Sequence, residues 1–184
     1  MGINLVKGQK INLQKDSGGG LTKVIMGLGW DPVKAGKSID LDASCALFDE
    51  QKKPLDLVYF GQLKSKDGSI THTGDNLTGE GEGDDEQIIV DLQKVPANVK
   101  FLVFTVNSYQ GQSFNEVANA FCRLVDGTNN QEIAKYTLSG GGAHTGLIMA
   151  KLYRHQGEWK MHALGDPASG RVAKDLVPAM VGVL

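Results

Sequence analysis

The sequence predicts an all-β protein, an antiparallel β-sandwich with short helices that include one at the C-terminus. Short runs rich in β-branched and aromatic residues recur along the chain, and turn residues separate them at regular intervals. The 24 glycines favour many turns over long helices. The 184 residues suffice for one domain with a substantial core, so we expect a single domain over residues 1–184.

The first half of the chain is expected to form short strands. Residues 3–6 and 11–13 indicate a hairpin-like start, and residues 22–30 predict an apolar strand that delivers Asp31 at its end. Further strands are expected at 39–48, 55–60 and 70–73. Side chains alternate within 39–48, so Cys45 shares its face with apolar residues and is expected in the core.

The second half continues the same pattern. Strands are expected at 87–92 and 99–106, and the latter is apolar almost throughout, which predicts a central, buried strand. Ser113 and Glu116 have the spacing of a capping box and predict a short helix. Strands follow at 121–125 and 132–138. A hairpin of 147–155 and 158–164 precedes an amphipathic helix over 172–180.

The segment 74–86 alternates acidic residues with glycines, and no Lys or Arg occurs from 73 through 93. Neighbouring carboxylates about 5 Å apart repel by roughly 3 kcal/mol per pair at an effective dielectric of about 20. A folded form of this loop therefore requires a cation. The candidate ligands are all oxygens, which suits calcium with its about 6–8 ligands better than zinc. A solvated acidic linker is the alternative.

A second acidic stretch upstream favours the calcium interpretation. Asp40 and Asp42 are two residues apart and share one strand face. The loop does not fit the EF-hand pattern, so we expect a site built from several loops at one end of the sandwich, with room for two calcium ions. The alternative that Glu80 and Glu82 remain solvated stays open. The predicted metal ligands are Asp31, Asp40, Asp42, Asp75, Asn76, Thr78, Gly79, Glu80, Glu82, Asp84, Asp85 and Glu86.

Four segments of the chain, 27–31, 40–44, 71–86 and 152–160, together resemble the TerD family, and the resemblance extends over nearly the whole chain. These are bacterial calcium-binding stress proteins linked to tellurium resistance. The resemblance implies a β-sandwich and a scaffold role in tellurite resistance and the general stress response. It also implies other Ter-family proteins and a membrane-associated stress complex as partners. Residues 166–170 are less typical of the family.

The remaining features exclude several functions. The formal charge of −2 does not suggest a nucleic-acid partner. No export leader precedes Ile3 and no apolar run approaches about 18 residues, so we expect a cytoplasmic protein without direct membrane insertion. Cys45 and Cys122 should then be reduced, although a redox role for the pair stays open.

We expect no enzymatic activity. Hydrolysis by carboxylates requires one acid that an apolar pocket keeps protonated, and a dense acidic cluster holds a cation more readily. Two alternatives are a calcium-dependent lectin-like domain and a carboxylate-based hydrolase domain.

Overall fold

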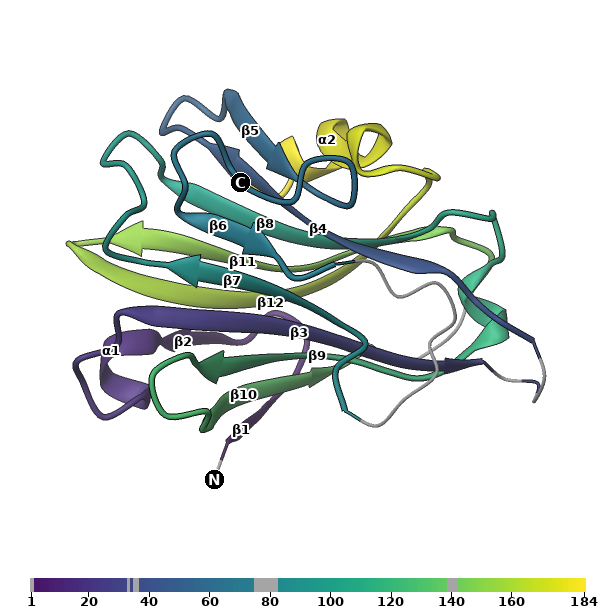
Figure 1. Cartoon of the computed structure of the whole chain (residues 1–184), viewed down its shortest axis with the longest axis horizontal. Coiled ribbons are helices and arrows are strands. Elements are labelled where there is room, and N and C mark those ends of the chain that lie inside the picture. The colour runs from purple at the N-terminus through teal and green to yellow at the C-terminus, as the bar shows by residue number, and fades with distance from the viewer. Residues whose placement is uncertain (1, 33, 35–36, 75–82, 139–141) are drawn as a thin grey trace.

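The computed structural model describes residues 2–32, 34, 37–74, 83–138 and 142–184, and it shows two six-stranded sheets packed face to face (Figure 1). Sheet A has the order β1 (Ile3–Leu5), β10 (Glu132–Thr137), β9 (Val117–Asp126), β3 (Lys23–Pro32), β7 (Glu86–Asp91) and β6 (Ile70–His72). Sheet B has the order β2 (Lys10–Asn12), β12 (Glu158–Ala168), β11 (Gly146–His155), β8 (Phe101–Ser108), β4 (Leu41–Phe48) and β5 (Pro54–Val58). The predicted antiparallel β-sandwich is confirmed.

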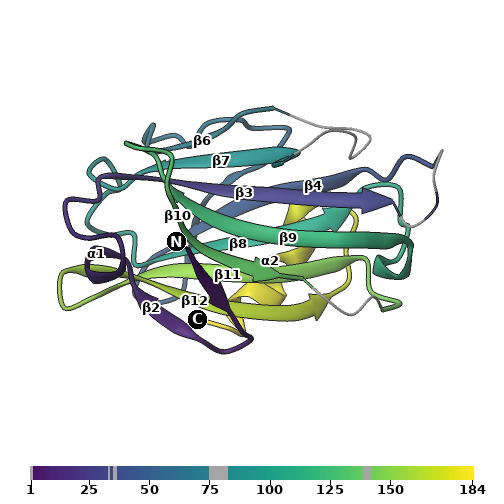
Figure 2. The same ribbon diagram turned by 90° about the horizontal axis from the view of Figure 1, so that it is seen from below.

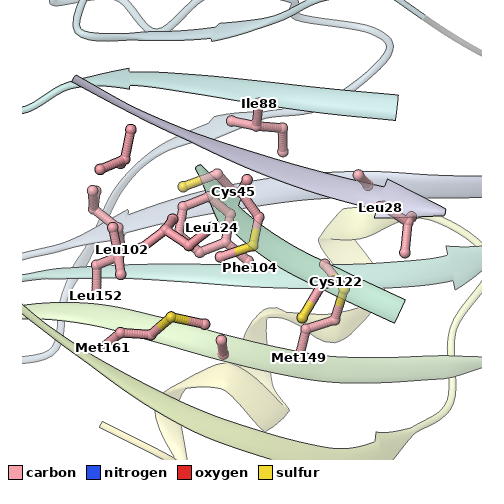
Figure 3. Packing of buried hydrophobic residues seen from close by; sticks show 14 of the residues in the cluster. Leu28, Cys45, Ile88, Leu102, Phe104, Cys122, Leu124, Met149, Leu152 and Met161 are labelled. Atoms are coloured by element: carbon pink, nitrogen blue, oxygen red, sulfur yellow. The ribbon is translucent and has the colours of Figure 1, made fainter. Parts of the chain in front are cut away.

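The main core lies between the sheets, where alternate side chains of each strand meet (Figure 3). In β7 the residues alternate between buried and partly exposed, as expected when only one face packs against another sheet. Cys45 and Cys122 are free, buried members of this core. Burial raises the pKa of the Cys122 thiol to about 12 and raises the pKa of Cys45 well above its ordinary value, so both are protonated packing residues at neutral pH.

A second apolar layer covers part of the outer face of sheet B. Helix α2 (Ala173–Val181) packs there, and Leu176 and Met180 contact a cluster that includes Phe48 and Val103. This confirms the predicted C-terminal helix. Because α2 covers their outer face, β4 and β8 are buried on both faces, which explains the continuous apolar run predicted to form a central strand.

The N-terminal hairpin prediction is wrong. Strand β1 lies in sheet A and is parallel to β10, whereas β2 lies in sheet B beside β12 (Figure 2). The connection is held by β12, because Gly8 N donates to Ala163 O and Ala163 N donates to Gln9 O. Each short strand therefore pairs with the free edge of a different sheet instead of pairing with the other.

The short helices differ in detail from the prediction. At Ser113 the chain forms one 3-10 turn, η1 (Phe114–Glu116), and the Ser113 side chain makes no capping hydrogen bond. An unpredicted helical turn, α1 (Leu13–Asp16), is capped by the Asn12 side chain, which accepts from two backbone N–H groups. Among the described residues, no helix is both long and apolar enough to cross a membrane.

Candidate metal centre

The acidic loop begins and ends on neighbouring strands of sheet A. Its first residue follows β6 closely and its last leads into β7, and Thr73 N donates to Gln87 O at 3.0 Å across the two ends. Residues 75–82 lie outside the described part of the chain. Six predicted ligands are therefore not placed: Asp75, Asn76, Thr78, Gly79, Glu80 and Glu82.

A buried pair joins the two ends of the loop. The side chains of His72 and Glu86 are completely buried, and Nε2 of His72 lies 3.2 Å from Oε2 of Glu86. His72 Nδ1 accepts a hydrogen bond from Gly74 N, so the ring proton resides on Nε2 and is donated to Glu86. Oε2 of Glu86 also accepts from Ala43 N of β4 at 2.7 Å. Glu86 thus ties the loop to both sheets.

Asp84 lies in a cradle that a glycine leaves open on β3. A Cβ atom at Gly27 would lie 2.4 Å from the Asp84 carboxyl group. Gln87 and Arg123 are the cross-strand neighbours of Gly27, one on each side. Arg123 donates two hydrogen bonds to Asp84, at 2.7 and 3.0 Å, and Gln87 donates one at 2.9 Å. The hydrogen bond to Asp84 raises the pKa of Arg123.

Two other predicted ligands, Asp31 and Asp85, line one pocket at the end of sheet A. Oδ2 of Asp85 accepts from Trp30 N at 2.8 Å, and Oδ2 of Asp31 accepts from Asn119 Nδ2 at 2.9 Å. Burial raises the pKa of Asp85, and the negative charges of Asp31 and Asp84 raise it further against the opposing Trp30 N–H bond. The pocket has a volume of about 540 Å³ and is lined by Trp30, Asp31, Gly83, Asp85, Asn119, Ala120, Phe121, Lys135 and Thr137.

Asp40 and Asp42 lie on sheet B. Asp40 directly precedes β4 and Asp42 is its second residue; both are buried, and Asp42 is the cross-strand partner of Asn107. They are not among the described residues that line the Asp31–Asp85 pocket. Asp42 is nevertheless adjacent to Ala43, whose N–H donates to Glu86 of the acidic loop. Within the part of the chain that the structure describes, no three His, Cys, Asp or Glu side chains form a group that could hold a metal ion.

Several residues that shape this site were not predicted from sequence. Gly29 leaves room for Phe121 and for the carbonyl oxygen of Gly83, just as Gly27 does for Asp84. Two glycines on one face of a strand are a signal of close backbone approach, so this cradle could have been inferred. Arg123 gives no local signal, because its partner lies 39 residues away.

Comparisons with known proteins agree with this architecture. Residues 1–177 match the model of the TerD domain family. The chain is 48% identical to tellurium resistance protein TerZ of Serratia marcescens, over 95% of this chain and 94% of that protein. It is 44% identical to stress response protein SCP2 of Bacillus subtilis (strain 168), over 98% of this chain and all of that protein.

A solved structure has the same fold. The crystal structure of a homologue of telluride resistance protein (TerD) from Streptomyces coelicolor A3(2) superposes with a TM-score of 0.75 at 20% sequence identity. The match covers 88% of this chain and 98% of that one. With the family match over nearly its whole length, this chain belongs to the TerD domain family, whose members include tellurium resistance and stress response proteins.

Proposed function

We propose that this protein binds calcium and acts without enzymatic activity as a scaffold in the stress response and tellurite resistance. The observation that carries the proposal is the meeting of Asp31 and Asp85 at one pocket, which Gly83 at the C-terminal end of the acidic loop also lines. Their mutual repulsion contributes to the raised pKa of Asp85. A cation at the pocket would remove that repulsion.

The donors present suit a hard cation. Asp31, Asp85 and the Gly83 carbonyl offer oxygen atoms at the pocket, and the acidic loop would complete the about 6–8 ligands that calcium takes. Asp84 and Glu86 fit better as anchors, because each already accepts several hydrogen bonds from the protein. Asp40 and Asp42, buried on sheet B next to the Ala43 N–H that Glu86 accepts, are the carboxylates that we assign to a second ion. Bound calcium would neutralise the carboxylates and hold the loop on the sandwich.

The cellular part of the proposal rests on the relatives. The names of TerZ and SCP2 refer to tellurium resistance and to the stress response. We extend to this chain a role in these processes, a cytoplasmic location, and partnership with other Ter-family proteins at a membrane-associated complex. Its own contribution would be a surface whose charge and loop conformation depend on calcium, since two ions would change the formal charge from −2 to +2.

Calorimetric titration of the metal-free protein with calcium, magnesium and zinc tests the proposal. Calcium should bind at micromolar or tighter concentrations, and magnesium much more weakly because it requires octahedral geometry and keeps its waters. Bound calcium should stabilise the fold by about 2.7 kcal/mol at a hundredfold excess over Kd, so a chelator should lower the Tm. Zinc binding tighter than calcium at neutral pH would contradict the oxygen site.

Variants test both groups of carboxylates. Asp31→Asn and Asp42→Asn should each weaken calcium binding by about tenfold or more, since each removes a carboxylate that its strand holds in position. Glu80→Gln should weaken it by only a few fold, because ordering a glycine-flanked residue costs about 1–2 kcal/mol. Glu50→Gln, at an exposed turn residue, is the charge-matched control and should have no effect. Calcium-dependent retention on a glycan array would favour the lectin-like alternative instead.

A further inference from the structure

The outer face of sheet B carries three basic side chains in one cross-strand row. Strands β2, β12 and β11 lie side by side (Figure 2). Lys10 of β2 pairs with His162 of β12, and His162 pairs with Lys151 of β11. Directly opposed residues of antiparallel strands lie on the same face with Cβ atoms about 4.5–5.5 Å apart. Adjacent residues in these strands point into the core, so this row points away from sheet A: Ile11, Leu152 and Met161 are the core residues concerned.

No ion pair among the described residues neutralises this row. The ion pairs among the described residues include neither Lys10, Lys151 nor His162. Two acidic residues lie close by, but both have other partners. Asp166 forms an ion pair with Lys7 at 3.0 Å. Glu158 accepts a hydrogen bond from Asn12 Nδ2 at 2.6 Å.

The surroundings of the row reflect this repulsion. Burial lowers the pKa of Lys151, and the positive charges of Lys10 and Lys52 lower it further. Burial likewise lowers the pKa of His162, with Lys151 and Lys10 acting in the same direction and Asp166 against it. At neutral pH the positive charge of the row therefore lies on Lys10 and Lys151, on either side of a mainly neutral His162, and an anion bound between them would offset their repulsion.

The row also has unused hydrogen-bonding capacity. His162 Nδ1 is buried and has no hydrogen-bond partner in the described part of the chain. Lys151 Nζ donates one bond to Val183 O at 2.5 Å and lies 5.7 Å from the ring centres of both Phe101 and Tyr153. An ammonium group has three donors, so two remain available. Lys10 is exposed, so its long side chain is free to turn toward His162, its cross-strand partner.

We propose that Lys10, His162 and Lys151 form a binding site for a phosphate-type oxyanion, either free phosphate or the phosphate group of a monoester. Charge-assisted hydrogen bonds from several cations are the interactions that a tetrahedral dianion accepts best. The row spans two strand spacings, about 10 Å, so the long side chains of Lys10 and Lys151 at its two ends can approach one anion at His162 between them. The rings of Phe101 and Tyr153 beside Lys151 offer an apolar surface to an attached organic group.

NMR titration of the metal-free, isotope-labelled protein with inorganic phosphate at constant ionic strength tests this site. We expect saturable shifts confined to β2, β11, β12 and the end of α2, and a rise in the pKa of the His162 ring as the anion binds. Lys10→Gln should weaken binding by about fivefold, the effect of losing about 1 kcal/mol of charge attraction at a surface. Lys66→Gln removes the same charge from an exposed position in the connection after β5 and should leave the affinity unchanged.

A second variant and further ligands complete the test. His162→Gln should reduce both the affinity for phosphate and the pH dependence of binding. If the His162 variant does not fold, the test rests on Lys10→Gln, because Lys10 is exposed. Tighter binding of phosphoserine or adenosine monophosphate than of phosphate would assign the anion to an organic monoester, and equal binding would assign it to the free ion. Shifts that chloride reproduces, equal effects of the Lys10 and Lys66 substitutions, or preferential binding of duplex DNA would overturn the proposal.

Discussion

Replacing Arg123 by glutamine should destabilise the protein more than a typical surface substitution. Arg123 supplies two of the three side-chain donors to Asp84, whose own side chain is only 1% exposed. Among the described residues, the substitution leaves Gln87 as the side-chain donor to the buried carboxylate. It also removes the weaker ion pair between Arg123 and Glu132, whose nearest atoms are 3.5 Å apart.

The expected loss follows from the exposure of the two partners. Breaking a buried ion pair by removing one member costs about 3–5 kcal/mol. The Arg123 side chain is 31% exposed, so water can reach the vacated position and replace part of the lost interaction. We therefore expect a loss of about 2–3 kcal/mol, which corresponds to a fall in Tm of about 5–10 °C for a protein of this size.

Urea denaturation of Arg123→Gln, Asp84→Asn and the double variant measures this loss and its origin. The double-mutant cycle should give a coupling energy above about 1 kcal/mol, because both single variants break the same contact. If Asp84 acts as an anchor and not as a metal ligand, the Asp84→Asn and Arg123→Gln variants should bind calcium with similar affinity. A loss below about 0.5 kcal/mol for Arg123→Gln, the range of ordinary surface changes, would refute the reasoning.

Three further outcomes follow from the structure. Gly29→Ala places a Cβ atom 2.4 Å from Phe121 and 2.7 Å from a backbone oxygen, so it should lower the free energy of unfolding by about 1–3 kcal/mol in urea denaturation. As the control, Gly182→Ala has its nearest contact at 3.4 Å and should leave the stability nearly unchanged. Burial opposes ionisation of Asp56, but hydrogen bonds from two backbone N–H groups and a glutamine side chain lower its pKa. The contribution of Asp56 to stability should therefore be present above about pH 4 and be lost as the pH falls through the lower pKa of the folded state. In acid denaturation curves, Asp56→Asn should remove this trend. Cys122, with a pKa of about 12, should resist alkylation at pH 8 until the protein is unfolded, as mass spectrometry can measure.

The fold could be predicted wherever one local pattern was sufficient. The alternation in β4 indicated a strand with one apolar face, and the apolar run of β8 indicated a central, buried strand. The turn at Gln156 and Gly157 indicated the β11–β12 hairpin. The N-terminal strands failed because three-residue strands carry little information about their partners. Their pairing depends on which sheet edges remain free after the long strands have assembled, and no local residue pattern records that.

In the candidate site, too, the sequence alone could not assign the role of each residue. In a sequence every carboxylate is equally a possible metal ligand and a possible partner for a donor of the protein. The fold separates the two roles by what lies within reach. Asp84 faces a guanidinium group and Glu86 faces an imidazole, so each is stabilised without a metal ion. Asp31 and Asp85 instead line one pocket, where the charge of Asp31 raises the pKa of Asp85. A cation bound there would offset this repulsion, so we expect calcium affinity to depend on both residues.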